Sequence, residues 1–173
     1  MEARENNRYV FIENDDIKDI LFRNFSGKPD KFHQNGQMPN FWLVLYEDAA
    51  KRLIDRGLNV RIFTNRDGDE EYRLQVFANY GNYPPTIYKK CGHNTVLLDD
   101  ESIGDLDRDE IIGIDLKISP YHWKFNNNEG VKAYISKGSF EILEDKIDMM
   151  MNGLSRLDEK APFDNIEEDL PWN

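Results

Sequence analysis

The sequence predicts a mainly β protein: a small antiparallel barrel with one principal helix, followed by an acidic tail without regular structure. Three observations favour this fold class over a parallel α/β sheet. Short strand-like runs recur at regular spacing, only one segment has the pattern of an amphipathic helix, and the pattern fades from about residue 148. In a chain of 173 residues, we therefore expect one domain at residues 1–147 and a tail at residues 148–173.

Strand-like segments account for most of the first 147 residues. They are rich in β-branched and aromatic side chains and are separated by segments rich in Gly, Pro and Asn, of which residues 26–40 form the longest. Asp67-Gly68 predicts a hairpin turn. Strands are expected at residues 9–12 (a short edge strand), 17–25, 41–46, 59–65, 72–80, 86–90, 95–99, 111–118 and 131–143.

The one expected helix covers residues 47–56. Its first turn carries acids, which suit the positive end of the helix dipole. Ala50, Leu53 and Ile54 share one face, and Gly57 is placed to end the helix.

Three of the expected strands separate an aliphatic face from a mixed face, because strand side chains alternate. The aliphatic sets, taken as core, are Val60 and Ile62; Leu74, Val76 and Ala78; and Val131, Ala133 and Ile135. The opposite sets mix rings, cations and amides: Arg61, Phe63 and Asn65; Arg73, Gln75, Phe77 and Asn79; and Lys132, Tyr134 and Ser136.

Single-stranded nucleic acid gives these mixed faces a function. Bases stack on aromatic rings for roughly 1–3 kcal/mol each, while Arg and Lys follow the phosphates. The structural alternative is a second small core, covered by a loop or by the partner in a homodimer.

Two further segments combine rings with cations and extend the candidate interface. Residues 79–90 contain Tyr88 and Lys89, and residues 121–125 contain Trp123 and Lys124. The predicted nucleic-acid-binding residues are Arg61, Phe63, Arg73, Phe77, Tyr88, Lys89, Trp123, Lys124, Lys132 and Tyr134.

Negative charge is concentrated near the C-terminus. The net charge is −11, from 22 bases and 33 acids. Residues 140–173 hold ten of the acids and three of the bases, a net of −7, which leaves −4 for residues 1–139. The average charge argues against polyanion binding. Because the negative charge is segregated, however, the capacity of residues 1–139 to bind a polyanion must be judged separately from that of residues 140–173.

The last ten residues, DNIEEDLPWN, place acids before Leu-Pro and an aromatic residue. This pattern resembles the acidic tip of single-stranded DNA-binding proteins and the acidic, aromatic-ended tail of the T7-type phage members. Here the ring is that of Trp172 rather than Phe, and Asn173 shifts the terminal carboxylate by one residue. The resemblance implies contacts with replication or recombination proteins through Asp164, Glu167, Glu168, Asp169, Leu170, Pro171 and Trp172.

Residues 17–140 resemble phage-encoded OB-fold binding proteins. The resemblance rests on Asn24-Phe25-Ser26-Gly27, on Asn40-Phe41, and on Gly57-Leu58-Asn59-Val60 at the helix end. It implies an OB-like barrel and sequence-tolerant coating of single-stranded DNA during viral replication or recombination, in the host cytoplasm.

Signals for other functions are weak. The sequence has no Walker A, G-x-G-x-x-G or G-x-S-x-G motif, so no enzyme and no cofactor are expected. Cys91 and His93 are too few ligands for a metal site, and the acids of residues 99–109 do not fit an EF-hand loop. No segment predicts a signal peptide or a membrane span. Two other functions stay open: an acidic DNA mimic that inhibits a host protein, and a metal-dependent nuclease.

Overall fold

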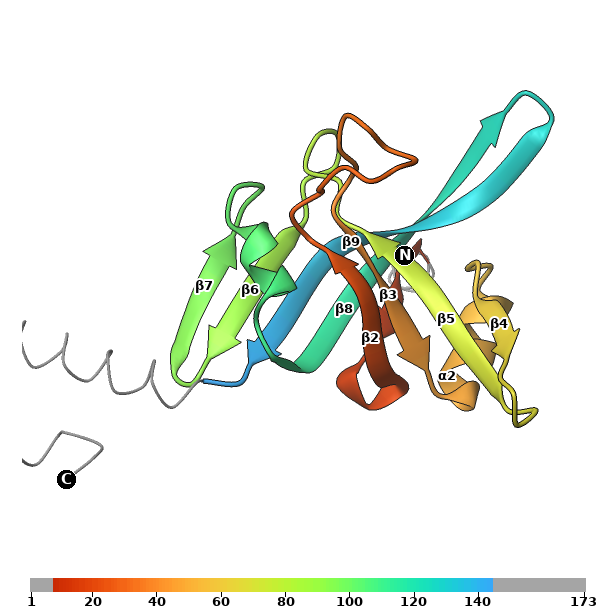
Figure 1. Cartoon of the computed structure of the whole chain (residues 1–173), viewed down its shortest axis with the longest axis horizontal. Coiled ribbons are helices and arrows are strands. Elements are labelled where there is room, and N and C mark those ends of the chain that lie inside the picture. Colours follow the sequence, from red (N-terminus) through yellow and green to blue (C-terminus); the bar gives the residue numbers. More distant parts are fainter. Residues whose placement is uncertain (1–7, 145–173) are drawn as a thin grey trace, which may run out of the picture. The chain divides into compact units, whose positions relative to one another are not determined.

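A computed structural model describes residues 8–144 of the chain and shows a mainly β domain with one α-helix in that range, as predicted (Figure 1). The predicted tail, residues 148–173, lies outside the described residues. The strands are β1 (Val10–Ile12), β2 (Ile17–Asn24), β3 (Asn40–Leu45), β4 (Arg61–Thr64), β5 (Glu70–Phe77), β6 (Thr86–Cys91), β7 (Asn94–Leu98), β8 (Ile111–Phe125) and β9 (Asn128–Ile142). The helices are α2 (Glu47–Asp55) and the 3₁₀ segments η1 (Asn14–Asp16) and η2 (Ile103–Asp107).

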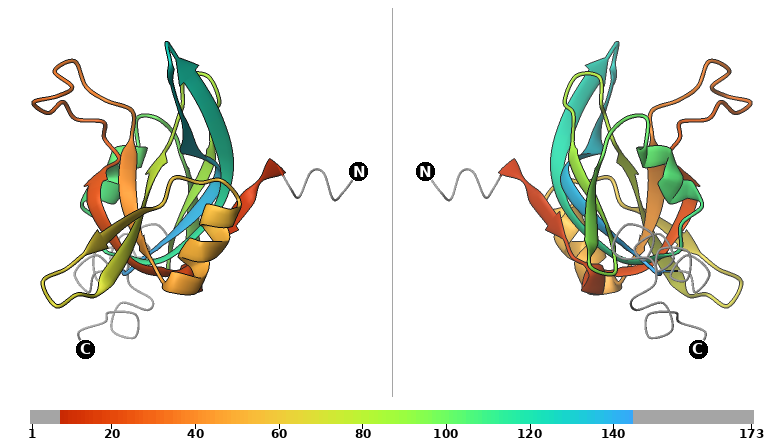
Figure 2. Two further views of the ribbon diagram at one scale, coloured as in Figure 1. Left: turned by 90° about the vertical axis from the view of Figure 1, so that its right-hand side faces the viewer. Right: turned by 90° about the vertical axis from the view of Figure 1, so that its left-hand side faces the viewer.

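All nine strands belong to one curved sheet. Its main order is β1-β8-β9-β5-β3-β2, with β4 paired to β5 and the β6–β7 hairpin paired to β9 (Figures 1 and 2). Most neighbours are antiparallel, but β5 and β6 both run parallel to β9. The long strand β9 is thus the centre of the sheet, and its edge away from β8 is shared by β5 and β6.

The barrel is OB-like but open, because β1 and β2 at the two ends of the order do not pair within residues 8–144. Segment η1 bridges the opening. The backbone N–H of Asn14 donates to Asp115 at 3.1 Å, and its side-chain oxygen accepts from the Ile114 N–H at 3.0 Å. The sheet therefore curls around one core without strand-to-strand closure.

The core confirms the predicted alternation in β5 and β9. Leu74, Val76, Ala133 and Ile135 are buried, as are three aromatic rings that meet at the centre of the core. These rings are Phe25, Phe41 and Phe140, with centroids 4.7 to 5.8 Å apart.

The same alternation is wrong for β4, where Ile62 is 52 % exposed. Strand β4 pairs only with β5, so Ile62 lies at the edge of the sheet opposite Tyr72 and stays half-exposed.

Helix α2 forms where the sequence predicts it, and Gly57, with φ of 89°, ends it in the left-handed conformation. Ala50 and Leu53 are buried as expected, but Ile54 is 40 % exposed, and Ala49 completes the buried face instead. Arg52 fixes the helix to the start of the chain through Asp16, at 2.8 Å, and the Phe11 carbonyl, at 3.3 Å.

Strands β8 and β9 are longer than expected. They continue as a two-stranded arm, residues 119–131, which projects from the sheet in Figure 1. Strand β1 pairs only with residues 116–118, so β8 is an edge strand from Ser119 onward. A proline is tolerated in an edge strand, and Pro120 therefore does not end β8.

Candidate nucleic-acid interface

Cross-strand pairing brings the mixed sets together on the outer side of the sheet. Side chains directly opposite each other share a face, and the register pairs Arg61 with Arg73, Phe77 with Tyr134, and Tyr121 with Lys132. The predicted mixed sets of β4, β5 and β9 thus form one surface. This surface, here called the aromatic face, consists of Phe22, Trp42, Arg61, Phe63, Arg73, Phe77, Tyr121, Lys132 and Tyr134.

At one end of the aromatic face, rings and guanidinium groups alternate. The Arg73 guanidinium carbon lies 4.4 Å from the Phe63 ring centroid and 5.7 Å from that of Phe22. Arg61 lies 5.4 Å from the Trp42 ring. Phe22 is 66 % exposed and Phe63 41 %, so both rings are available to a base.

At the other end, Phe77 and two tyrosines continue the row. The Phe77 and Tyr134 rings meet edge to face at 6.2 Å, and Tyr134 lies 5.4 Å from Tyr121. The Lys132 ammonium lies 5.2 Å from the Phe77 ring. Burial, with a smaller contribution from Tyr121, raises the pKa of Tyr134, so its hydroxyl stays a neutral hydrogen-bond donor near neutral pH.

The cations of the aromatic face are not equivalent. Arg73 donates through Nε and Nη2 to one carboxylate oxygen of Glu71, at 2.6 and 2.5 Å, so its charge is already compensated. Arg61 and Lys132 form no ion pair within residues 8–144. These two cations are therefore the readier phosphate contacts.

The arm carries Trp123 on the same side as Lys132 and Tyr134, because Trp123 pairs with Gly130, two residues from Lys132. The indole packs directly on Gly130: a Cβ there would lie 2.8 Å from three ring atoms. Lys124, the next residue in β8, pairs with Glu129 and projects to the opposite side of the arm. The structure thus joins Trp123 to the predicted set and separates Lys124 from it.

Tyr88 and Lys89 lie on β6, on opposite sides of the strand, and away from the aromatic face. The Lys89 ammonium is 2.5 Å from the Asp109 carboxylate, and both groups are about three-quarters buried. Tyr88 lines a different hollow of the outer surface. Of the ten predicted residues, seven gather on the aromatic face and its arm, and Tyr88, Lys89 and Lys124 do not.

Phe22 and Trp42 are members of the aromatic face that the sequence did not single out. Strict alternation would place Phe22 beside Ile20, on the core side. A register shift between Leu21 and Asn24 interrupts β2, and Phe22 adopts a φ of 52°, which is rare for a bulky residue. Trp42 belongs to an apolar run in which both faces look alike, so no local signal could identify it.

The acids of residues 99–109 hold the fold together. Asp107 accepts hydrogen bonds from the backbone N–H groups of Phe25, at 2.6 Å, and Ser26, at 3.1 Å, while Asp99 caps its own turn through Ser102.

Within residues 8–144, no three His, Cys, Asp or Glu side chains gather as a metal site would require. No helix in that part of the chain is long and apolar enough to span a membrane.

An open OB-like barrel with exposed or partly buried rings and cations in one row has the architecture of a single-strand nucleic-acid-binding module. Residues 4–170 match the family model described as a putative phage ssDNA-binding domain, and the chain belongs to that family. It is a phage-type single-stranded DNA-binding protein. No curated protein matches the sequence.

Several solved structures are similar to this fold. The single-stranded DNA-binding protein from bacteriophage Enc34 matches with 11% identity and a TM-score of 0.48, covering 77% of this chain and 80% of that one. The structure of that protein in complex with ssDNA matches with 11% identity and a TM-score of 0.47, covering 77% of this chain and 85% of that one. The single-stranded DNA-binding protein gp2.5 of bacteriophage T7 matches with 12% identity and a TM-score of 0.41, covering 81% of this chain and 92% of that one.

Proposed function

We propose that the aromatic face is where this protein holds single-stranded DNA, without catalysis and with little sequence preference. Bases stack on Phe63, Phe77, Tyr134 and, on the arm, Trp123. Arg61 and Lys132 neutralise phosphates, and Arg73 does so once it leaves Glu71. The observation that supports this proposal is the alternation of exposed or partly buried rings with cations across β4, β5, β9 and β8.

The biological setting that we propose is phage replication or recombination. The acidic segment with Asp164, Leu170, Pro171 and Trp172 would bind partner proteins of that machinery, since an anionic strand with one aromatic anchor suits a basic pocket. This segment lies outside the described residues, so its support is the sequence pattern and the family.

The test is the double substitution Phe63→Ala with Phe77→Ala. Each lost stacking contact costs about 1–3 kcal/mol, so we expect the affinity for oligo-dT to fall by at least about tenfold. Both rings lie outside the buried core, so the circular dichroism spectrum and the unfolding midpoint should change little. Fluorescence anisotropy at fixed salt measures the affinity.

Tyr46→Ala is the matched control, because Tyr46 is a 52 % exposed ring at the start of α2 and is not part of the aromatic face. It should bind oligo-dT like the unmodified protein. Unchanged affinity in the Phe63/Phe77 double variant would exclude the aromatic face as the DNA-binding surface. If that variant instead changed the sedimentation coefficient, the rings would belong to a homodimer interface.

The family membership favours DNA binding over the acidic DNA mimic. A mimic needs carboxylates arrayed on its folded surface and binds no nucleic acid. On the aromatic face, Arg61 and Lys132 have no acidic partner within residues 8–144, and Glu71 is held by Arg73. If the full chain bound no single-stranded oligonucleotide, the acidic DNA mimic would become the better proposal for its function.

A further inference from the structure

A hollow of about 830 Å³ lies on the outer side of the sheet, over β1, β6, β8 and β9. It is separate from the aromatic face and combines the same types of side chain. The residues used below, which define what we call the lysine hollow, are Phe11, Tyr88, Lys90, Lys117 and Lys137. Phe11 is 48 % exposed.

The charges of the lysine hollow are unfavourably arranged for the protein alone. Lys117 of β8 and Lys137 of β9 are direct cross-strand partners, and like charges in that position destabilise a sheet. Neither they nor Lys90 form an ion pair within residues 8–144. Of the two acids that line the hollow, Glu13 and Asp115, the latter already accepts the Asn14 N–H. A bound anion would relieve the repulsion.

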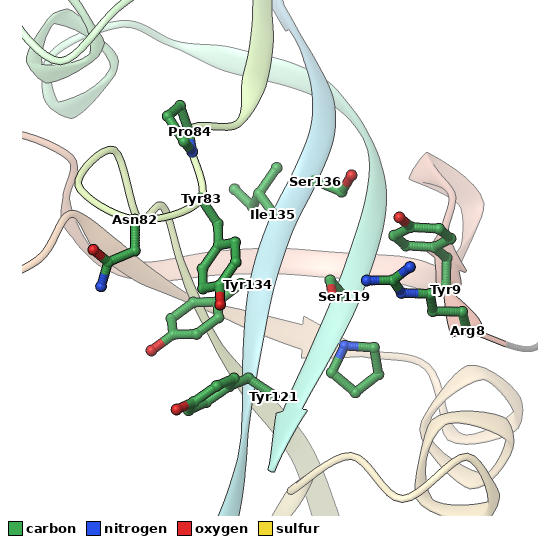
Figure 3. Close-up of a pocket in the computed structure, with 11 residues that line it drawn as sticks. Arg8, Tyr9, Asn82, Tyr83, Pro84, Ser119, Tyr121, Tyr134, Ile135 and Ser136 are labelled. Carbon is green, nitrogen blue, oxygen red and sulfur yellow. The ribbon is translucent and has the colours of Figure 1, made fainter. Parts of the chain in front are cut away.

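A second hollow, of about 480 Å³, lies beside the aromatic face. Tyr121 and Tyr134 of the aromatic face line it together with Tyr83 and Tyr9. Figure 3 shows Tyr83, Tyr121 and Tyr134 gathered beside β9, and Tyr9 on the far side of β8. The Tyr9 ring then lies 4.1 Å from the Lys117 ammonium. Tyr9 therefore lines this hollow and also contacts a cation of the lysine hollow, so the two hollows are adjacent.

We propose that the lysine hollow is a second contact for single-stranded DNA. The strand leaves the aromatic face over Tyr134, crosses the tyrosine-lined hollow and places phosphates at Lys117, Lys137 and Lys90. Tyr88 and Phe11 supply rings for a base. This inference rests on the proposed function and extends it: the DNA follows the outer surface from β5 across β9 and β8 to β6.

The double substitution Lys117→Gln with Lys137→Gln in the full chain tests this path with two lengths of oligo-dT. Site sizes of OB folds run from about 4 to 16 nucleotides, so an oligomer of about 5 fits the aromatic face alone and one of about 16 reaches the lysine hollow. The salt slope is the steepness with which the logarithm of the binding constant falls as the logarithm of the salt concentration rises. For single strands each neutralised phosphate contributes about 0.7 to this slope. We expect the slope to fall by about 1.4 for the long oligomer and to stay unchanged for the short one.

Lys18→Gln with Lys51→Gln is the matched control, because it removes two exposed lysines outside both hollows. It should leave both slopes unchanged. The Lys117/Lys137 variant should unfold at or above the temperature of the unmodified protein, since a repulsion is removed; a clearly lower midpoint would contradict the charge argument.

The outcomes separate this inference from the proposed function. If the Phe63/Phe77 variant loses binding at both lengths while the Lys117/Lys137 variant keeps the full slope on the long oligomer, only the second contact is overturned. An equal loss of slope at both lengths would also overturn it, as a general charge effect. If the lysine variant changes only the proteolytic protection of residues 164–173, the hollow holds that segment and not DNA.

Discussion

At the scale of single residues, Arg73 shows how the fold restrains a binding group. Its guanidinium lies between Phe22 and Phe63 and is held by Glu71, two residues earlier on the same side of β5. A phosphate must displace the carboxylate to reach it. In the proposed binding mode, Glu71 would therefore compete with DNA for Arg73, and it would also keep the guanidinium in place for stacking.

Glu71→Gln should tighten single-stranded DNA binding about two- to fivefold at low salt. The change removes a partly exposed ion pair worth up to about 1 kcal/mol and one negative charge beside the proposed DNA path. Anisotropy titrations with oligo-dT at several salt concentrations measure it. Asp67→Asn, the same charge change at the exposed β4–β5 turn, is the control and should have a smaller effect. Weaker binding would mean that Glu71 chiefly orients Arg73.

At the scale of elements, the β8–β9 arm is the part of the proposed interface with the fewest neighbouring strands. Residues 119–131 pair only within the β8–β9 hairpin, and β9 meets β5 only beyond the arm, at Ala133 and Tyr134. Trp123 seated on Gly130 is its main internal packing contact. The position of the indole toward DNA depends on the absence of a side chain at residue 130.

Gly130→Ala should displace the Trp123 ring, because the new Cβ would lie 2.8 Å from three of its atoms. We expect a changed tryptophan fluorescence spectrum and oligo-dT affinity lowered by up to about tenfold, the loss of one stacked base. The unfolding midpoint should change little, since the arm lies outside the core. Gly81→Ala, where the nearest neighbouring atom is 3.5 Å from the new Cβ, is the control. Unchanged affinity would exclude Trp123 from the interface.

At the scale of the whole molecule, the chain combines a net charge of −11 with a row of rings and cations on the outer surface. Most of the excess negative charge belongs to residues 140–173, so residues 1–139 are close to neutral. A polyanion tethered to a DNA-binding domain would compete with DNA for the same cations.

Removal of residues 164–173 should tighten single-stranded DNA binding, by roughly several-fold at low salt and by less near 0.15 M, where charges are screened beyond about 8 Å. Mobility shifts with single- and double-stranded DNA, for the full and shortened chains, measure this effect. Weaker binding by the shortened chain would show that the acidic segment is not an internal competitor.

The sequence by itself determined the features that depend on neighbouring residues: the mainly β class, the helix that ends before Gly57, the Asp67-Gly68 turn and the alternation of β5 and β9. Period-two alternation is a local property, so the mixed faces with Phe63, Phe77 and Tyr134 could be found without knowing their neighbours.

Only the tertiary structure decided which faces meet. Strand pairing set Phe77 beside Tyr134 and Lys117 opposite Lys137, a bulge turned Phe22 toward Arg73, and Asp109 engaged Lys89. Pairing and register join residues far apart in the chain, and their free energies come from the packing of the whole sheet, which no local pattern encodes.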